Sequence, residues 1–229
     1  MSRRSSSAFA WIALCLATAI GIIHVTASAS PTASSAGRLL YPLLAVDSSP
    51  ARDEILRAGH GTYIGRILLD RDSTLDRWSD RVASPIRVWV EPASQPGFTA
   101  LVQEAFGEWV DVGLPLRFIF VGRARDAEIT VRWTEHLERK TGNTVWRVDN
   151  HGWMRSGDVL LATHTGDGRP LEAQSLRAIA LHEVGHLIGL AHSDDGHDVM
   201  APLVRVSALS AADRATARLL YTLPAGHLR

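Results

Sequence analysis

The chain has 229 residues, of which 46% are hydrophobic and 21% are charged, a composition typical of one globular domain with extensions. Lys+Arg and Asp+Glu both number 24, so the net charge gives no reason to expect nucleic acid or an anionic membrane surface as a partner. The single cysteine is Cys15, so the sequence after it can form no internal disulfide and supplies no thiolate metal ligand.

The N-terminus has the pattern of a secretory signal peptide over residues 1–29. Arg3 and Arg4 precede an apolar run from Ala8 to Ile23, and Ala27-Ser28-Ala29 follows as an A-x-A cleavage site. The run is also close to the length of a membrane span, so an uncleaved anchor through residues 8–25 stays open. Both interpretations place the rest of the chain outside the cytoplasm, either secreted or periplasmic or held at the membrane.

Residues 30–84 are expected to form a linker followed by an N-terminal extension or pro-segment. Residues 30–37 are rich in Ser, Ala, Thr and Pro, which is typical of a flexible linker. The extension, residues 38–81, could be cleaved off, block a functional cleft or brace the sheet. Its charged end predicts a solvated face rather than a calcium site, because arginines alternate with the acids. The acids are Asp70, Asp72, Asp76 and Asp80, and the arginines are Arg71, Arg77 and Arg81.

From Pro85 onward the sequence predicts strands with one early helix. Apolar residues alternate over residues 86–90, as in a half-buried strand. Apolar residues then repeat at helical spacing over residues 101–109, with Thr99 as the expected N-cap and with Gly113 and Pro115 as the stop. Further strands are expected at residues 116–121, 128–133, 144–148 and 158–163, with a turn at residues 149–152.

Two late helices complete the domain, residues 85–229. The first is expected from about Glu172 to Ile188. The second begins at a capping box, Ser210-x-x-Asp213, and runs to about Tyr221. This order predicts an α/β or α+β domain in which a twisted sheet carries helices on one side.

The segment 182–192 reads H-E-x-x-H-x-x-G-x-x-H, which predicts a zinc site. On a helix, His182 and His186 lie on one face, one turn apart. Gly189 can adopt the left-handed conformation that ends a helix, so the chain can return His192 as a third ligand. Catalytic zinc typically takes three protein ligands and a water. Glu183 is the expected general base for that Zn-bound water.

With these residues identified, the chain resembles the metzincin metallopeptidases, and among them the matrixins. Ser193 follows the third histidine, as in the matrixin branch, and Met200 lies where metzincins place a methionine turn beneath the metal. The closing helix after Ser210 is also similar. The resemblance covers residues 85–224 and implies a zincin-like catalytic domain. Such a domain has a twisted, mostly parallel sheet, an early helix, an active-site helix and a C-terminal helix, and it holds one catalytic Zn²⁺.

The resemblance also implies how a polypeptide substrate would bind. An extended peptide would pair with an exposed strand edge, for which residues 144–148 are our candidate. The pocket for the residue after the cut would have Ala178 near its floor, which suggests space for a large hydrophobic side chain. Its wall would be formed by Pro202, Leu203 and Val204.

The sequence departs from relatives in three respects. It has no cysteine switch, and Ala-Pro after Met200 gives no reason to expect the extra tyrosine ligand of astacins and serralysins. Ca²⁺ or a second Zn²⁺ is not expected, because the spacing of the candidate ligands does not match. These candidates are His151, Asp158, His164 and Asp167.

The sequence therefore predicts a monomeric, extracytoplasmic zinc endopeptidase. One alternative is a catalytically silent zinc-binding domain that recognises peptides. Loss of Glu183 would be the simplest way to lose activity, yet Glu183 is present. Another is a membrane-anchored protein in which zinc only stabilises the fold. That alternative requires a closed shell with a fourth ligand from Asp194, Asp195 or His197.

Overall fold

The structure is a computed structural model that describes residues 50–228. The predicted signal peptide or anchor, Cys15 and the predicted linker lie outside the described residues. Among residues 50–228, no helix is long and apolar enough to cross a membrane.

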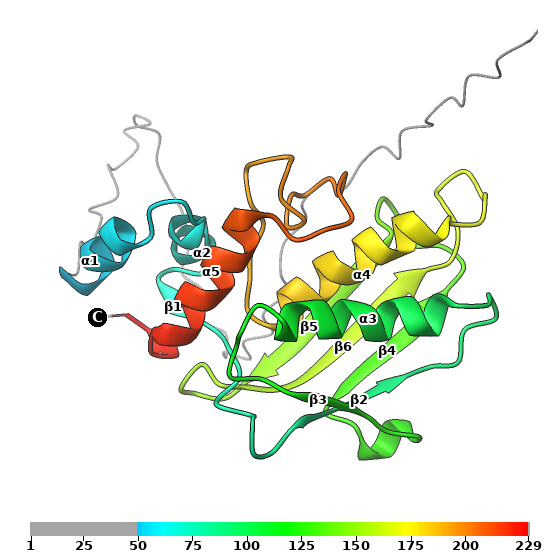
Figure 1. The fold of residues 1–229 in the computed structure, drawn as a ribbon, viewed down its shortest axis with the longest axis horizontal. Coiled ribbons are helices and arrows are strands. Elements are labelled where there is room, and N and C mark those ends of the chain that lie inside the picture. Colours follow the sequence, from blue (N-terminus) through cyan, green and yellow to red (C-terminus); the bar gives the residue numbers. More distant parts are fainter. Residues whose placement is uncertain (1–49, 229) are drawn as a thin grey trace, which may run out of the picture.

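A five-stranded sheet with the order β3-β2-β4-β6-β5 supports the domain (Figure 1). Its strands are β2 (Ile86–Val90), β3 (Phe118–Phe120), β4 (Ile129–Thr134), β5 (Gly142–Val148) and β6 (Met154–Ala162). The first four in sheet order are parallel to their neighbours, and β5 runs antiparallel along the edge. The prediction of a mostly parallel sheet is confirmed, and β3 is shorter than expected.

The burial of β2 follows from its alternating sequence. Ile86, Val88 and Val90 are buried, whereas Arg87 between them is exposed. At the other edge, β5 and β6 form a hairpin through the predicted turn at residues 149–152. Gly152 supplies the left-handed conformation that this turn needs, with φ of 78°. Strand β5 lies beside the helix that carries His182 and His186, the metal helix.

Helices α3 (Phe98–Val110) and α4 (Ala173–Leu187) lie side by side on one face of the sheet (Figure 1). Trp109 joins them, because its indole Nε1 donates to the Leu181 carbonyl oxygen at 2.9 Å. The predicted N-cap of α3 is wrong: Gly97, with φ of 84°, occupies that position. The Thr99 hydroxyl instead accepts a bond from the Ala93 amide at 3.1 Å.

Helix α5 (Ala211–Thr222) begins at the predicted capping box. The Ser210 hydroxyl accepts from the Asp213 amide, and the Asp213 carboxylate accepts from the Ser210 amide, each at 2.9 Å. These two bonds satisfy amides that the first helical turn leaves without partners.

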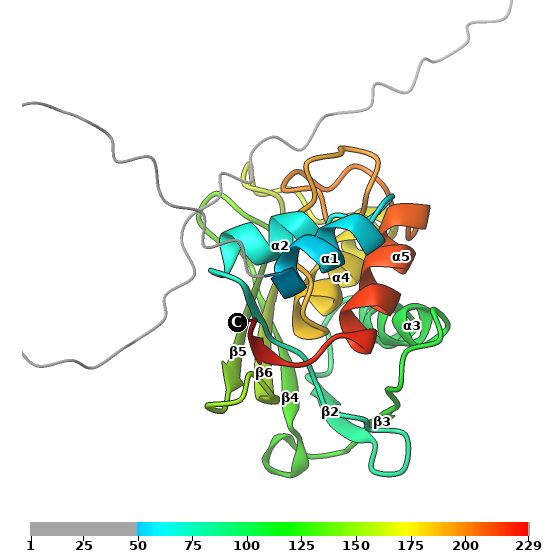
Figure 2. The same cartoon turned by 90° about the vertical axis from the view of Figure 1, so that its left-hand side faces the viewer.

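The N-terminal segment forms two helices that the sequence did not predict, α1 (Pro50–Ala58) and α2 (Ile64–Asp70), and a short strand, β1 (Thr74–Leu75), that pairs with β7 (Gly226–His227). A 3₁₀ turn, Ala124–Asp126, follows β3. Figure 2 shows α1 and α2 beside α5. The buried residues of α2 join the central core. They are Ile64, Ile67 and Leu68.

The predicted solvated face over residues 70–81 is only partly correct. Asp72 and Asp80 are exposed, but the side chains of Arg71 and Asp76 are only 7% and 14% exposed. Arg71 turns inward because backbone carbonyls and the Trp146 ring provide partners for its guanidinium. A domain boundary at residue 85 stays a prediction, although buried Trp78 lies on the other side of it.

Candidate metal centre

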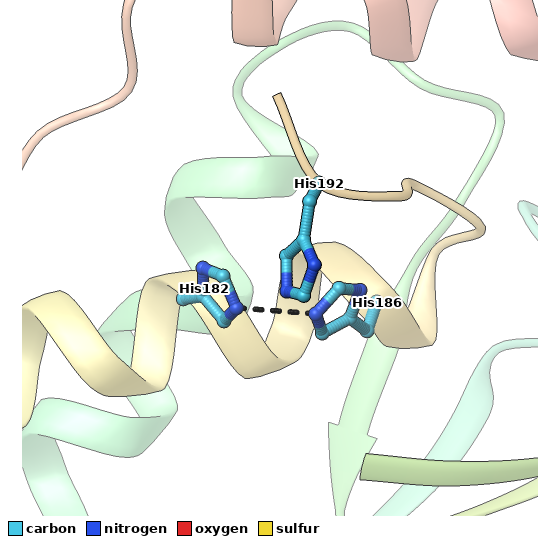
Figure 3. Close-up of side chains that lie close together, drawn as sticks. All are labelled: His182, His186 and His192. Atoms are coloured by element: carbon cyan, nitrogen blue, oxygen red, sulfur yellow. Dashed lines mark hydrogen bonds between the residues drawn. The ribbon is translucent and has the colours of Figure 1, made fainter. Parts of the chain in front are cut away.

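Three histidines meet at the C-terminal end of α4 (Figure 3). His182 and His186 lie one turn apart on the helix, and their Nε2 atoms are 3.1 Å apart. The helix ends at Leu187, and Gly189, with φ of 105°, turns the chain so that His192 returns to the same place. One nitrogen from each ring lies within 4.8 Å of the other two. The structure therefore brings the three predicted ligands together.

Backbone carbonyls fix the orientation of two rings. His182 Nδ1 lies 2.8 Å from the Val199 carbonyl oxygen, and His186 Nδ1 lies 2.9 Å from the Leu190 carbonyl oxygen. A carbonyl oxygen only accepts, so each Nδ1 carries the proton and each neutral ring presents the lone pair of Nε2. Two lone pairs facing each other at 3.1 Å repel one another unless a cation lies between them.

The electrostatics of these rings suits a metal. Burial lowers the pKa of His182 to about 4 and lowers the pKa of His186 well below its ordinary value. Burial also lowers the pKa of His192. Neutral imidazoles are the form that binds metal, and three of them match a zinc site that keeps one position for water. The residues present therefore fit a zinc ion.

Glu183 is buried next to the two helical histidines and points toward the edge strand. The Thr144 hydroxyl donates to Glu183 Oε2 at 2.5 Å. Gly142, also on β5, passes so close that a Cβ there would overlap the Glu183 side chain. Burial raises the pKa of the Glu183 carboxyl to about 7, while the Thr144 hydrogen bond and the charge of Lys140 lower it. Nothing in the spacing of the sequence indicated that Thr144 would bond to Glu183.

Met200 lies beneath the helix and is fully buried. Its carbonyl accepts from the Ser193 amide at 2.9 Å, which ties the loop after His192 to the predicted methionine turn. Its sulfur lies against Gly185, where any side chain would overlap it. Gly185 therefore allows the methionine to approach the helix between the two metal-binding turns. The assignment of a methionine turn stays a prediction.

The predicted substrate pocket is not tested by these contacts. Ala178, one turn before His182, is buried with 8% exposure. The predicted wall residues, Pro202, Leu203 and Val204, are partly exposed.

The candidates for a fourth ligand point into solvent. The side chain of Asp194 is 81% exposed, and His197, 94% exposed, pairs with Asp195 at 2.8 Å. In the part of the chain that the structure describes, the one group of three or more possible metal ligands is the histidine triad. A closed four-ligand shell has no support in this geometry.

The candidates for a second metal have separate partners. Asp158 bonds to Thr130 and Arg147, and Asp167 bonds to Arg169. His151 lies in the β5–β6 turn, and the His164 ring packs near His136, with centroids 5.5 Å apart.

A mostly parallel sheet, a helix with two of the histidines and a glycine-turned loop with the third define a metzincin-type metallopeptidase domain. A protein-family model described as matrixin matches residues 86–222, more than half of the chain. The chain belongs to the matrixin family.

Individual relatives match part of the chain. Matrix metalloproteinase-C of Caenorhabditis elegans is 28% identical over an alignment of 151 residues that covers 59% of this chain and 25% of that protein. Metalloendoproteinase 1 of Glycine max is 40% identical over 52 residues, which is 23% of this chain and 15% of that protein. The chain therefore spans a quarter or less of the length of these relatives. The crystal structure of myroilysin is similar with a TM-score of 0.45 and 14% identity, covering 64% of this chain and 86% of that one.

Proposed function

We propose that the chain is an extracytoplasmic zinc endopeptidase that hydrolyses peptide bonds of polypeptides. One observation carries this proposal: three neutral histidine side chains converge on one point, and a buried carboxylate, Glu183, lies beside two of them on the same helix. The extracytoplasmic location is inferred from residues 1–29 alone.

His182, His186 and His192 would hold the ion, and Zn²⁺ bound there would polarise the scissile carbonyl and make a water molecule acidic. The Glu183 carboxylate accepts the proton of the attacking water and then delivers it to the leaving amine nitrogen as the peptide bond breaks. A pKa near 7, which burial produces, suits a group that must both take and return a proton. The Thr144 hydroxyl holds this carboxylate in one orientation.

The substrate is proposed to bind as an extended strand along β5. In the sheet, β5 pairs with β6 and ends the strand order, so its other edge offers backbone donors and acceptors to a peptide. Backbone pairing holds peptides of many sequences in register, which suits an endopeptidase. Ala178 and residues 202–204 remain our candidates for a pocket that accepts a large hydrophobic residue after the cut.

The test compares cleavage of casein or gelatin by the wild-type chain and by Glu183→Ala, at matched zinc content. General-base catalysis contributes about 10² to 10⁴ in rate, so we expect a loss of at least about 100-fold. Glu172→Ala is the matched control, because Glu172 is an exposed glutamate at the start of the same helix. Equal rates for wild type and Glu183→Ala would remove Glu183 from the mechanism.

A further inference from the structure

The end of the metal helix is held by side chains from the N-terminal segment. The Trp78 indole Nε1 donates to the Leu187 carbonyl oxygen at 2.7 Å. Arg71 donates from Nη1 to the Gly189 carbonyl oxygen at 3.0 Å and from Nη2 to the Leu190 carbonyl oxygen at 3.1 Å. Carbonyls at a helix end lack partners within the helix, so these bonds satisfy groups that would otherwise be buried without a donor.

One of these carbonyls also orients a predicted metal ligand. The Leu190 carbonyl oxygen accepts from both Arg71 Nη2 and His186 Nδ1. The Arg71 side chain is only 7% exposed, and its guanidinium lies over the Trp146 ring, 4.8 Å from the centroid. Packing and two hydrogen bonds thus hold the guanidinium in one position, and the guanidinium in turn fixes the peptide unit to which His186 is bonded.

A second connection from the same segment leads to His182. The Tyr63 hydroxyl donates to Asp213 Oδ1 at 3.0 Å, and Asp213 Oδ2 accepts from the Val199 amide at 2.9 Å. The carbonyl of Val199 is the partner of His182 Nδ1. His186 is therefore bonded to a peptide unit that Arg71 holds directly, and His182 is bonded to the carbonyl of Val199, a residue whose amide is held by Tyr63 through Asp213.

We propose that residues 63–78 are a permanent part of the working metal centre and that Arg71 is a positioning residue for His186. This inference rests on the proposed zinc-binding role of the three histidines. Of the three fates that the sequence left open for the extension, bracing applies to this part, but at the metal centre rather than at the sheet. Any processing of the chain would have to cut before Tyr63.

Two effects of Arg71 on a metal oppose each other. Its positive charge repels a cation, whereas its hydrogen bonds hold the ligand geometry. The guanidinium lies on the Nδ1 side of the His186 ring, and the metal-facing atom is Nε2 on the other side. The repulsion between the guanidinium and the metal acts across the His186 ring, while the hydrogen bond from Arg71 acts directly on the Leu190 carbonyl that orients this ring. We therefore expect positioning to dominate.

The experiment measures Zn²⁺ affinity of the full-length chain by competition with a chromophoric chelator. Variants are Arg71→Met, which keeps the apolar stem, and Arg71→Lys, which keeps the charge but cannot bond both carbonyls in the same fork. The control is Arg218→Met, because Arg218 lies outside residues 63–78 and, like Arg71, donates to the backbone carbonyl of a distant residue, that of Val112, at 2.9 Å. The visible spectrum of the Co²⁺-loaded chain reports ligand geometry in each variant.

We expect about tenfold weaker zinc binding for Arg71→Met, the lower end of the range for partners of metal ligands, and an altered Co²⁺ spectrum. Arg71→Lys should also bind more weakly, whereas Arg218→Met should keep wild-type affinity and spectrum. Affinity for Arg71→Met equal to or tighter than that of Arg218→Met would overturn the positioning role. Should Arg71→Met fail to fold, the same comparison with Arg71→Lys decides. A wild-type chain that binds no zinc would instead refute the proposed function.

Whether residues 63–78 are retained in the active protein is tested by measuring the intact mass of the mature protein. We expect the first residue of the zinc-loaded, active species to lie at or before Tyr63. Full activity in a species that begins after Trp78 would contradict the inference while leaving the proposed peptidase activity intact.

Discussion

Gly185 lies on the metal helix between the two helical histidines, where an added Cβ has no room. A Cβ there would overlap the Met200 sulfur and lie 3.1 Å from Trp109 Cζ2. The methionine can move, but Trp109 is fully buried and bonded to the Leu181 carbonyl, so it cannot easily give way. Overpacking of this kind costs about 1–3 kcal/mol, against a gain of about 0.5–1 kcal/mol from replacing glycine with alanine in a helix.

The control is Gly107→Ala on α3, because a Cβ at Gly107 would meet nothing within 4 Å. Both variants share the helix-propensity gain, so the difference between them isolates the overlap and should be about 1–3 kcal/mol in the free energy of unfolding. For a domain of this size, that difference corresponds to roughly 2–12 °C in Tm, with Gly107→Ala the more stable. Urea unfolding of both metal-free variants measures it directly. Equal stability of the two would refute the close approach of Met200 to the helix.

Three further outcomes follow from single contacts. Thr144→Val removes a bond that lowers the Glu183 pKa, so the acid limb of kcat/KM should move to higher pH, whereas Thr144→Ser should leave it in place. Trp78→Phe leaves the buried Leu187 carbonyl without its donor and should cost about 1–3 kcal/mol in urea unfolding; a neutral result would contradict the bond. Partial burial raises the pKa of Asp158, but hydrogen bonds from Thr130 and Arg147 outweigh it, so the pKa is lower than usual. The ionised carboxylate therefore stabilises the fold above the ordinary aspartate pKa, and this stabilisation is lost as pH falls through the lowered pKa. Asp158→Asn should therefore lose less than about 1 kcal/mol at pH 7, since the Arg147 pair is largely exposed, and this difference from wild type should shrink in acid.

Local patterns predicted the parts of the structure that local physics decides. The i, i+4 histidines, the turn at Gly189 and the capping box at Ser210 and Asp213 each depend on a few adjacent residues, and each is found as expected. The wrong prediction of the α3 N-cap is also decided by adjacent residues. Thr99 is a good N-cap by type, but the left-handed Gly97 starts the helix two residues earlier and leaves the threonine to bond Ala93.

Contacts between distant parts of the chain could not be read from spacing. The alternating charges around Arg71 are typical of a solvated surface. Only the fold shows that its guanidinium donates to the carbonyls of Gly189 and Leu190, which lie 118 and 119 positions later in the chain. Trp78 meets Leu187 across 109 positions in the same way. Thr144 was expected only as part of a strand edge, and its bond to Glu183 depends on how the hairpin packs on α4.

Titration of the metal-free chain with Zn²⁺, followed by peptide hydrolysis, tests most directly whether His182, His186 and His192 hold one catalytic ion. Activity should be absent without metal, rise in proportion to added Zn²⁺ and reach its plateau at one equivalent, while His186→Ala should stay inactive at that ratio. Hydrolysis by the metal-free wild-type chain, or undiminished activity of His186→Ala at one equivalent, would contradict the proposed site.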